Sequence, residues 1–293
     1  MNELPFAVVG SGPVAREMGT VLARDGARCV AVLSRSDERA RDAAAYLGAP
    51  VATTRPAELP PEVRLVLVAT RDDAIVETAR ALGAAGVARG RTLVHFAGSL
   101  PAEAMRLPET EGALVVSIHP LRHFELARVQ PETFAGTFCA IDGDDEPASE
   151  LARRVGDAGG VPFRVRGDAK GLYMASVLVP ITLMPALIAE AERGLEAAGV
   201  TPEDTRALVA HLVQRKAAEL VKRPAVDALH GPLAHGDIPV MTRAIEAVRR
   251  LHPALLPIFR ALGESTLARA LERRLLGNSQ AEKMRRALGI EPT

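Results

Sequence analysis

The stretch Phe6-Ala7-Val8-Val9-Gly10-Ser11-Gly12-Pro13-Val14-Ala15 decides the fold of this chain. Residues 6–9 form a short apolar run that predicts a buried strand, and a helical pattern follows over residues 13–25. Gly10 would permit the tight turn between them, Gly12 the close approach of a pyrophosphate, and the small Ala15 close packing of helix on strand. The motif therefore predicts a dinucleotide-binding turn. The alternative is an α/β domain that keeps the turn and binds nothing.

Further apolar runs alternate with helical patterns through the first half of the chain. Strands are predicted at 29–33, 65–69, 92–95, 114–117, 137–142 and 161–165, with helices at 37–47, 73–84 and 146–157. Strands that are apolar on both faces and separated by helices are typical of a parallel sheet covered on both sides. The sequence thus predicts an α/β fold, a Rossmann doubly wound, mostly parallel sheet over residues 1–167.

The strand signals end after Asp168, and an all-helical domain is predicted over residues 168–276. Helices are expected at 169–198, 201–223, 238–250 and 253–274, the first of them interrupted by Pro180 and Pro185. Residues 277–293 form a short basic segment that we expect to be a weakly packed tail.

Composition narrows the class of protein. The 293 residues include 36 basic and 36 acidic side chains, so no global charge attracts nucleic acid or an anionic membrane. Cys29 and Cys139 lie in apolar runs without metal-binding spacing, which favours two reduced thiols in a cytoplasmic protein.

The uncharged stretch 171–189 is long enough for a marginal transmembrane helix, but its two prolines and the lack of a basic flank favour a helix buried in the helical domain. Its long apolar face predicts a homodimer through that domain.

The end of the second predicted strand indicates which cofactor binds. An NAD-preferring site usually places a carboxylate there for the ribose hydroxyls. This chain has Ser34, Arg35 and Ser36, with Arg39 one helical turn further on, a set that suits the 2′-phosphate of NADP. The alternative is an exposed, solvated turn. Ala69, Thr70 and Asp73, at the end of the third long strand, complete the predicted cofactor-binding residues.

Polar side chains follow the later strands, where a parallel sheet binds its ligands. Ser99 and His119 come from two such strand ends, and Lys170 and Tyr173 share one face of the first helix of the second domain. We expect all four to contact substrate in an interdomain cleft, with Lys170 or His119 as the proton donor. A structural histidine and a solvated lysine at a helix start are the alternatives.

Several segments together resemble a bacterial two-domain family with a Rossmann-like N-terminal domain and a C-terminal helical domain of unknown function. They are Gly10 to Ala15, Ser34-Arg35-Ser36, Asp72 to Ile75, His95 to Ser99, Ser117 to Leu121, Lys170 to Tyr173, and Gly231-Pro232 with Gly236-Asp237. More distantly the chain is similar to pyrroline-5-carboxylate reductases, ketopantoate reductases and β-hydroxyacid dehydrogenases. The last group pairs its catalytic lysine with an asparagine one turn on, where this chain has Met174.

The resemblance implies NADP-dependent reduction and dimerisation through the helical domain. Together with the motifs it predicts an oxidoreductase that transfers hydride to or from a small carbonyl or imine substrate. The alternative function is a non-catalytic NADP-binding sensor or scaffold that keeps the Rossmann domain.

Overall fold

The alternating pattern of the first half builds one eight-stranded sheet in the computed structural model, which describes residues 4–23, 26–124 and 134–290. The sheet order is β3-β2-β1-β4-β5-β6-β7-β8, and only β6 and β7 pair antiparallel. The strands are β1 (Leu4–Val9), β2 (Ala27–Leu33), β3 (Val51–Thr53), β4 (Leu65–Val68), β5 (Thr92–His95), β6 (Leu114–Pro120), β7 (Phe138–Gly143) and β8 (Val161–Arg164). The predicted Rossmann α/β fold is therefore confirmed, with the short β3 as the one strand that the sequence pattern did not reveal.

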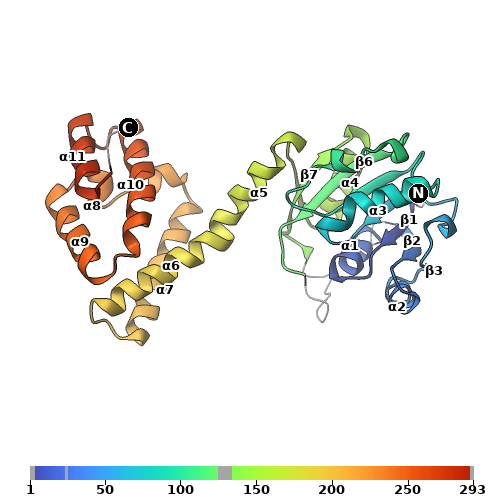
Figure 1. Cartoon of the computed structure of the whole chain (residues 1–293), viewed down its shortest axis with the longest axis horizontal. Helices are drawn as coiled ribbons and strands as arrows, with labels where there is room; N and C mark the ends of the chain where they lie inside the picture. Colours follow the sequence, from blue (N-terminus) through green and yellow to red (C-terminus); the bar gives the residue numbers. More distant parts are fainter. Residues whose placement is uncertain (1–3, 24–25, 125–133, 291–293) are drawn as a thin grey trace. The chain divides into compact units, whose positions relative to one another are not determined.

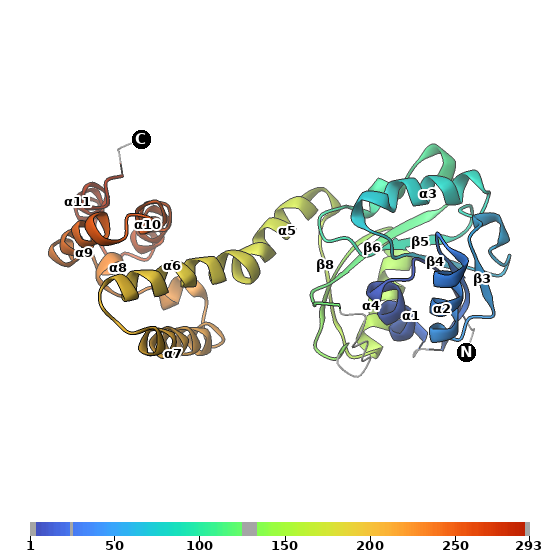
Figure 2. The same ribbon diagram turned by 60° about the horizontal axis from the view of Figure 1, so that its bottom comes forward.

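Helices cover both faces of this sheet, as Figures 1 and 2 show. On one face lie α1 (Pro13–Ala23), α2 (Asp37–Leu47) and α4 (Asp145–Asp157), and on the other lies α3 (Ile75–Ala84). The strand residues between the two layers are almost fully buried, which is why the strands are apolar on both sides. The last two residues of the predicted helix 13–25 lie outside the described residues. Short helical turns occur at η1 (Pro56–Glu58), η2 (Asp72–Ala74), η3 (Ala102–Met105), η4 (Pro108–Thr110), η7 (Gly167–Ala169) and η9 (Ala225–Ala228).

The long helix predicted over 169–198 forms in three parts. They are α5 (Lys170–Leu178), a π-helical turn at Val179–Leu183, and α6 (Met184–Ala197). Pro180 and Pro185 lack a backbone N–H, and the wider π turn accommodates the hydrogen bonds that are lost. The chain divides into two compact units, Met1–Val177 and Leu178–Thr293, so the division falls inside this helix and not at its predicted start near residue 168.

The second unit is helical throughout its described part. After α6 it contains α7 (Pro202–Leu220), α8 (Pro232–His235), α9 (Ile238–Leu251), α10 (Leu255–Glu272) and α11 (Asn278–Leu288). Thr201 caps α7 by accepting a hydrogen bond from the Asp204 N–H, as its position before Pro202 suggests. The core of the unit is formed by α9, α10 and α11.

The expectation of a weakly packed C-terminal tail is wrong for most of its residues. Ala281, Met284 and Leu288 of α11 are fully buried against Ile245 and Leu267. Their spacing places them on one helical face, a pattern that the basic residues around them concealed. Residues 291–293 lie outside the described residues.

The apolar residues of the helix 171–189 are not buried within the unit to which each belongs, whereas the sequence predicted a buried helix. Within Gly167–Ala197 the most apolar 18-residue window has no buried residue. Ile181 is 61 % exposed, and Leu172, Val179, Leu183 and Met184 are also exposed. By length and composition this segment is the one helix among the described residues that could cross a membrane.

Candidate functional site

The turn between β1 and α1 has the geometry that a dinucleotide loop requires. Gly10 has φ +122°, and a Cβ at this position would overlap the carbonyl oxygen of Ala69 at the end of β4. Its N–H donates to the carbonyl of Leu33 at 2.8 Å, which joins the turn to the end of β2. Around Gly12, by contrast, a Cβ would meet no atom within 4 Å. The backbone at Gly10 is therefore packed against β4, whereas the space beside Gly12 is open. A pyrophosphate would lie in that space, at the N-terminus of α1.

A cavity of about 780 Å³ opens at this edge of the sheet. Its size suits a nucleotide-containing ligand. Nine of the predicted cofactor-binding residues line it, namely Gly10, Ser11, Gly12, Ser34, Arg35, Arg39, Ala69, Thr70 and Asp73. Pro13, Val14 and Ala15 do not line it, and Ala15 is buried where α1 packs on the sheet. The predicted residues thus lie together around one cavity in the first unit.

One end of the cavity carries positive charge. Arg35 and Arg39 are exposed there beside Ser34, whose hydroxyl lies 3.3 Å from that of Ser11. No carboxylate among the described residues forms a recorded ion pair with either arginine, so both guanidinium groups can receive a phosphate. The hydroxyl of Ser36 is already used, because it caps α2 by accepting from the Arg39 N–H at 3.4 Å.

The cavity is also lined by residues that the sequence analysis did not assign to cofactor binding, among them Thr54 and Arg71. Thr54 follows the short β3, a strand too brief to leave a pattern. Arg71 lies beside the predicted Asp73 and is held by it, with both nitrogen–oxygen distances at 3.2 Å. The donor set, an open glycine turn with two guanidinium groups near the end of β2, fits a phosphate-containing dinucleotide.

His119 and Tyr173 meet at the same carboxyl edge of the sheet. The Nδ1 atom of His119, near the end of β6, lies 3.0 Å from the hydroxyl oxygen of Tyr173 on α5. The two rings are nearly perpendicular, at 83°, with centroids 5.9 Å apart. Burial lowers the pKa of His119 to about 4, assisted by the nearby Lys170, and burial raises the pKa of Tyr173 to about 12. At neutral pH a neutral imidazole therefore faces a protonated phenol.

Gly98 provides the space for this pair. A Cβ on Gly98 would lie 2.8 Å from Cε1 and 2.9 Å from Nε2 of His119, and 2.8 Å from the sulfur of Met174. Only a residue without a side chain fits between them. The Met174 position, where β-hydroxyacid dehydrogenases place asparagine, is thus used for packing against the loop that follows β5.

Lys170 lies deeper than its predicted role requires. Its side chain is 0 % exposed, and its ammonium contacts the carbonyl of Ala97 at 3.2 Å, the hydroxyl of Ser117 and, at 2.8 Å, Oδ1 of Asp142. An ammonium has three N–H donors, and these three acceptors use all of them. Desolvation lowers the pKa of Lys170, while Asp142 opposes that shift. In this arrangement no N–H of Lys170 is available to a substrate.

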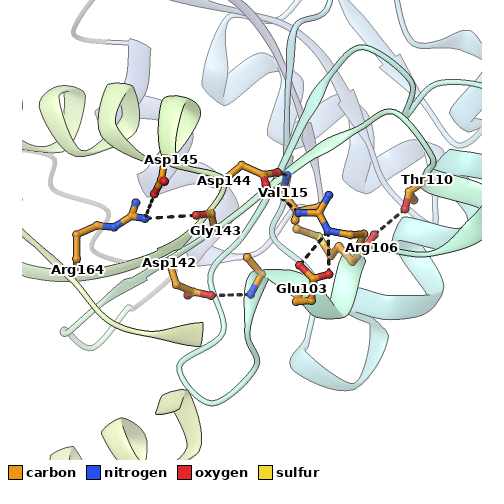
Figure 3. Close-up of polar contacts among 11 residues, drawn as sticks. Glu103, Arg106, Thr110, Val115, Asp142, Gly143, Asp144, Asp145 and Arg164 are labelled. Atoms are coloured by element: carbon orange, nitrogen blue, oxygen red, sulfur yellow. Dashed lines mark hydrogen bonds and ion pairs between the residues drawn. The ribbon is translucent and has the colours of Figure 1, made fainter. Parts of the chain in front are cut away.

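Asp142, the partner of this lysine, was also missed by the sequence analysis. Its Oδ2 accepts from the backbone N–H of Ala102 at 2.8 Å, as the close-up in Figure 3 shows. Two acidic residues that follow it also have partners (Figure 3). Asp144 accepts hydrogen bonds from the Val115 N–H and from Arg106, and Asp145 accepts one from Arg164. An acidic run at a helix start gives no sequence signal that one of its members is buried and paired.

The remaining predicted residues have separate fates. Ser99 is exposed, next to Gly98. The expectation that Lys170 lies in a cleft between the two domains stays a prediction. His95 is fully buried, with Nδ1 accepting from the Ala97 N–H at 3.2 Å and Nε2 beside the Pro101 carbonyl at 3.2 Å. His95 therefore has a structural role, holding the loop that follows β5.

The sheet, the glycine turn and the cavity define the class of fold: an NAD(P)-binding Rossmann domain like that of oxidoreductases. Residues 4–91 match the model of the oxidoreductase family with an NAD-binding Rossmann fold. Residues 137–266 match the domain of unknown function DUF2520. The chain thus pairs a Rossmann NAD-binding domain with a C-terminal helical DUF2520 domain, as the resemblance in its motifs implied.

Solved structures share this two-part fold over almost the whole chain. A protein of Thermotoga maritima is 21 % identical with a TM-score of 0.72, covering 92 % of this chain and 99 % of its own. An imine reductase of Aspergillus terreus, solved with NADPH4 and dibenz[c,e]azepine, is 17 % identical with a TM-score of 0.64, covering 92 % and 95 %. A pyrroline-5-carboxylate reductase of Coxiella burnetii is 14 % identical with a TM-score of 0.57, covering 100 % of each chain. No curated protein matches this sequence. These likenesses are evidence for the fold.

Proposed function

We propose that this protein is an NADP(H)-dependent reductase of a small carbonyl or imine substrate. The observation that carries the proposal is the His119–Tyr173 pair, which lies on the same sheet edge as the phosphate loop and its cavity. Several of the similar structures are reductases, including the imine reductase named above. Bound NADPH would supply the hydride for the substrate carbon.

Tyr173 is the proton donor in this proposal. Its phenol is protonated at neutral pH, and its O–H breaks as the proton passes to the oxygen or nitrogen that gains negative charge. The neutral imidazole of His119 donates from Nδ1 to the phenolate that remains, which lowers the energy of that anion. A proton from solvent then restores the phenol. Ser99, exposed beside Gly98, is proposed to contact the substrate.

Arg35, Arg39 and Ser34 are proposed to hold the 2′-phosphate of NADP. A carboxylate at this place would repel that phosphate, and none forms a recorded pair with either arginine in the described part of the chain. The Rossmann turn itself is common to NAD and NADP sites.

We also propose that a second copy of the chain covers the exposed apolar face of α5 and α6. That face contains Leu172, Val179, Ile181, Leu183 and Met184, and a patch of this kind is normally buried against a partner. Two prolines and the carboxylates of Glu190 and Glu192 near its end disfavour a membrane as the occupant.

The function is tested with purified protein and a panel of small ketones, aldehydes and cyclic imines, following NADPH oxidation. Tyr173→Phe and His119→Phe should each lower kcat about 100-fold or more, while the Kd for NADPH stays unchanged. Tight NADPH binding without turnover of any substrate would favour the sensor alternative. Full activity of Tyr173→Phe would remove Tyr173 from the mechanism.

A further inference from the structure

One buried ammonium joins three neighbouring strands to the first turn of a helix. Lys170 is the first residue of α5. Its three partners are the carbonyl of Ala97 after β5, the hydroxyl of Ser117 in β6 and the carboxylate of Asp142 in β7. Asp142 is fixed in turn by the Ala102 N–H. A charge removed from water is stable only when it is paired, so two hydrogen bonds and the ion pair with Asp142 hold the ammonium at this place.

The consequence falls on the residues one turn further along α5. Tyr173 is three positions after Lys170 and Met174 four, so all three face the same side of the helix. Tyr173 reaches His119, and Met174 packs where Gly98 leaves space. The rest of α5 offers little packing of its own, because Leu172 is 71 % exposed and Lys170 is the only fully buried residue of the helix.

We propose that Lys170, held by Asp142, Ser117 and the Ala97 carbonyl, is a positioning residue that fixes α5 to the sheet edge and so places the Tyr173 hydroxyl against His119. Lys170 then acts through Tyr173 and gives no proton to the substrate. Asp142 is the matching acceptor without which the lysine would leave this position. The expected effect of Lys170 on kcat rests on the proposed function. Its effect on the position of the Tyr173 hydroxyl does not.

The first test therefore measures geometry without a substrate. Nitrogen NMR of the His119 ring reports whether Nδ1 has its hydrogen-bond partner, and Tyr173→Phe provides the spectrum of the lost contact. Lys170→Met should move the His119 resonances toward that spectrum. Lys283→Met, a change of an exposed lysine in α11, is the matched control and should leave them unchanged.

A single change can prevent folding, because it leaves one buried charge unpaired. The double variant Lys170→Met with Asp142→Asn removes both charges and keeps an acceptor for the Ala102 N–H. We expect it to fold, to show the Tyr173→Phe pattern at His119, and to bind NADPH with an unchanged Kd. Wild-type His119 resonances in this folded double variant would overturn the proposal.

Activity provides the second readout when a substrate is found. The double variant should lower kcat about 10-fold or more, and the alkaline limb of its pH profile should stay where Tyr173 sets it. An alkaline limb that disappears with Lys170 would instead make the lysine the proton donor and would also overturn the proposal. If the His119 resonances shift as expected but the wild type reduces nothing, the positioning role stands and the proposed function fails.

Discussion

The Nδ1 atom of His119 lies 3.0 Å from the hydroxyl of Tyr173, although the two residues are 54 positions apart in sequence. His119 comes from β6, which pairs parallel with β5 and antiparallel with β7, and Tyr173 comes from the helix that follows the sheet. Both side chains are partly buried, which keeps the imidazole neutral and the phenol protonated at neutral pH. Changes that separate His119 from Tyr173 should therefore lower kcat.

Substitution of Gly98 should impair the pair without affecting the cofactor cavity. In Gly98→Ala the new Cβ would lie 2.8 Å from both the His119 ring and the Met174 sulfur, so these side chains must move. We expect kcat to fall about 10-fold or more, with the NADPH Kd within about two-fold of wild type. Gly156→Ala, at an exposed position of α4 where φ is not positive and a Cβ meets nothing within 4 Å, is a control for the loss of a glycine. Equal kcat for Gly98→Ala and wild type would show that the close approach has no functional importance.

Cofactor preference should depend on Arg35. A charge-assisted contact to the 2′-phosphate contributes about 1.5–3 kcal/mol, so NADPH should bind roughly tenfold to a hundredfold more tightly than NADH. Calorimetry on Arg35→Ala should show most of this difference lost through weaker NADPH binding alone. Arg41→Ala, an exposed arginine of α2 outside the cavity, should keep it. Equal affinities of the wild type for both cofactors would contradict the NADP assignment.

Acidification should destabilise the Rossmann unit through His95 and His119. Burial lowers the pKa of each to about 4, against 6.5 for a free side chain. Between these values the unfolded chain binds more protons, so the free energy of unfolding falls as the pH drops from about 6.5 to about 4. For the fully buried His95 the loss approaches about 3 kcal/mol.

Denaturant unfolding at several pH values measures this effect. His95→Gln should be less stable than wild type near neutrality, but its stability should depend less on pH over the same interval. If the free energy of unfolding of His95→Gln depends on pH as steeply as that of the wild type, His95 does not cause the acid destabilisation.

The oligomeric state should respond to charge on the exposed apolar helix. Ile181→Glu should convert the proposed dimer into a monomer in light scattering, because a carboxylate would be buried in the interface. Val221→Glu, at the 88 % exposed end of α7, is the matched control and should remain a dimer. A wild type that is monomeric at micromolar concentration would contradict the homodimer, and partition into vesicles would indicate a membrane as the occupant.

The sequence alone determined the Rossmann fold and the cofactor end of the site. Apolar runs, helix caps and the glycine turn act between residues close in sequence, so local patterns could place Gly10, Gly12 and Arg35 at the sheet edge where the cavity opens, and their contacts with a cofactor stay a prediction. The same holds for the long helix and its proline interruption, which the π turn after Leu178 confirms. The weakly packed tail was wrong because the charged residues of α11 masked a buried stripe three and four residues apart.

Only the tertiary structure decided the role of Lys170. Whether a lysine faces a substrate or the protein interior depends on which acceptors surround it, and here Ala97, Ser117 and Asp142 come from three strands far from it in sequence. The same pairing across strands brought His119 to Tyr173 and left Gly98 no room for a side chain. Local propensity carries no information about such long-range contacts, because they exist only once the sheet order is fixed.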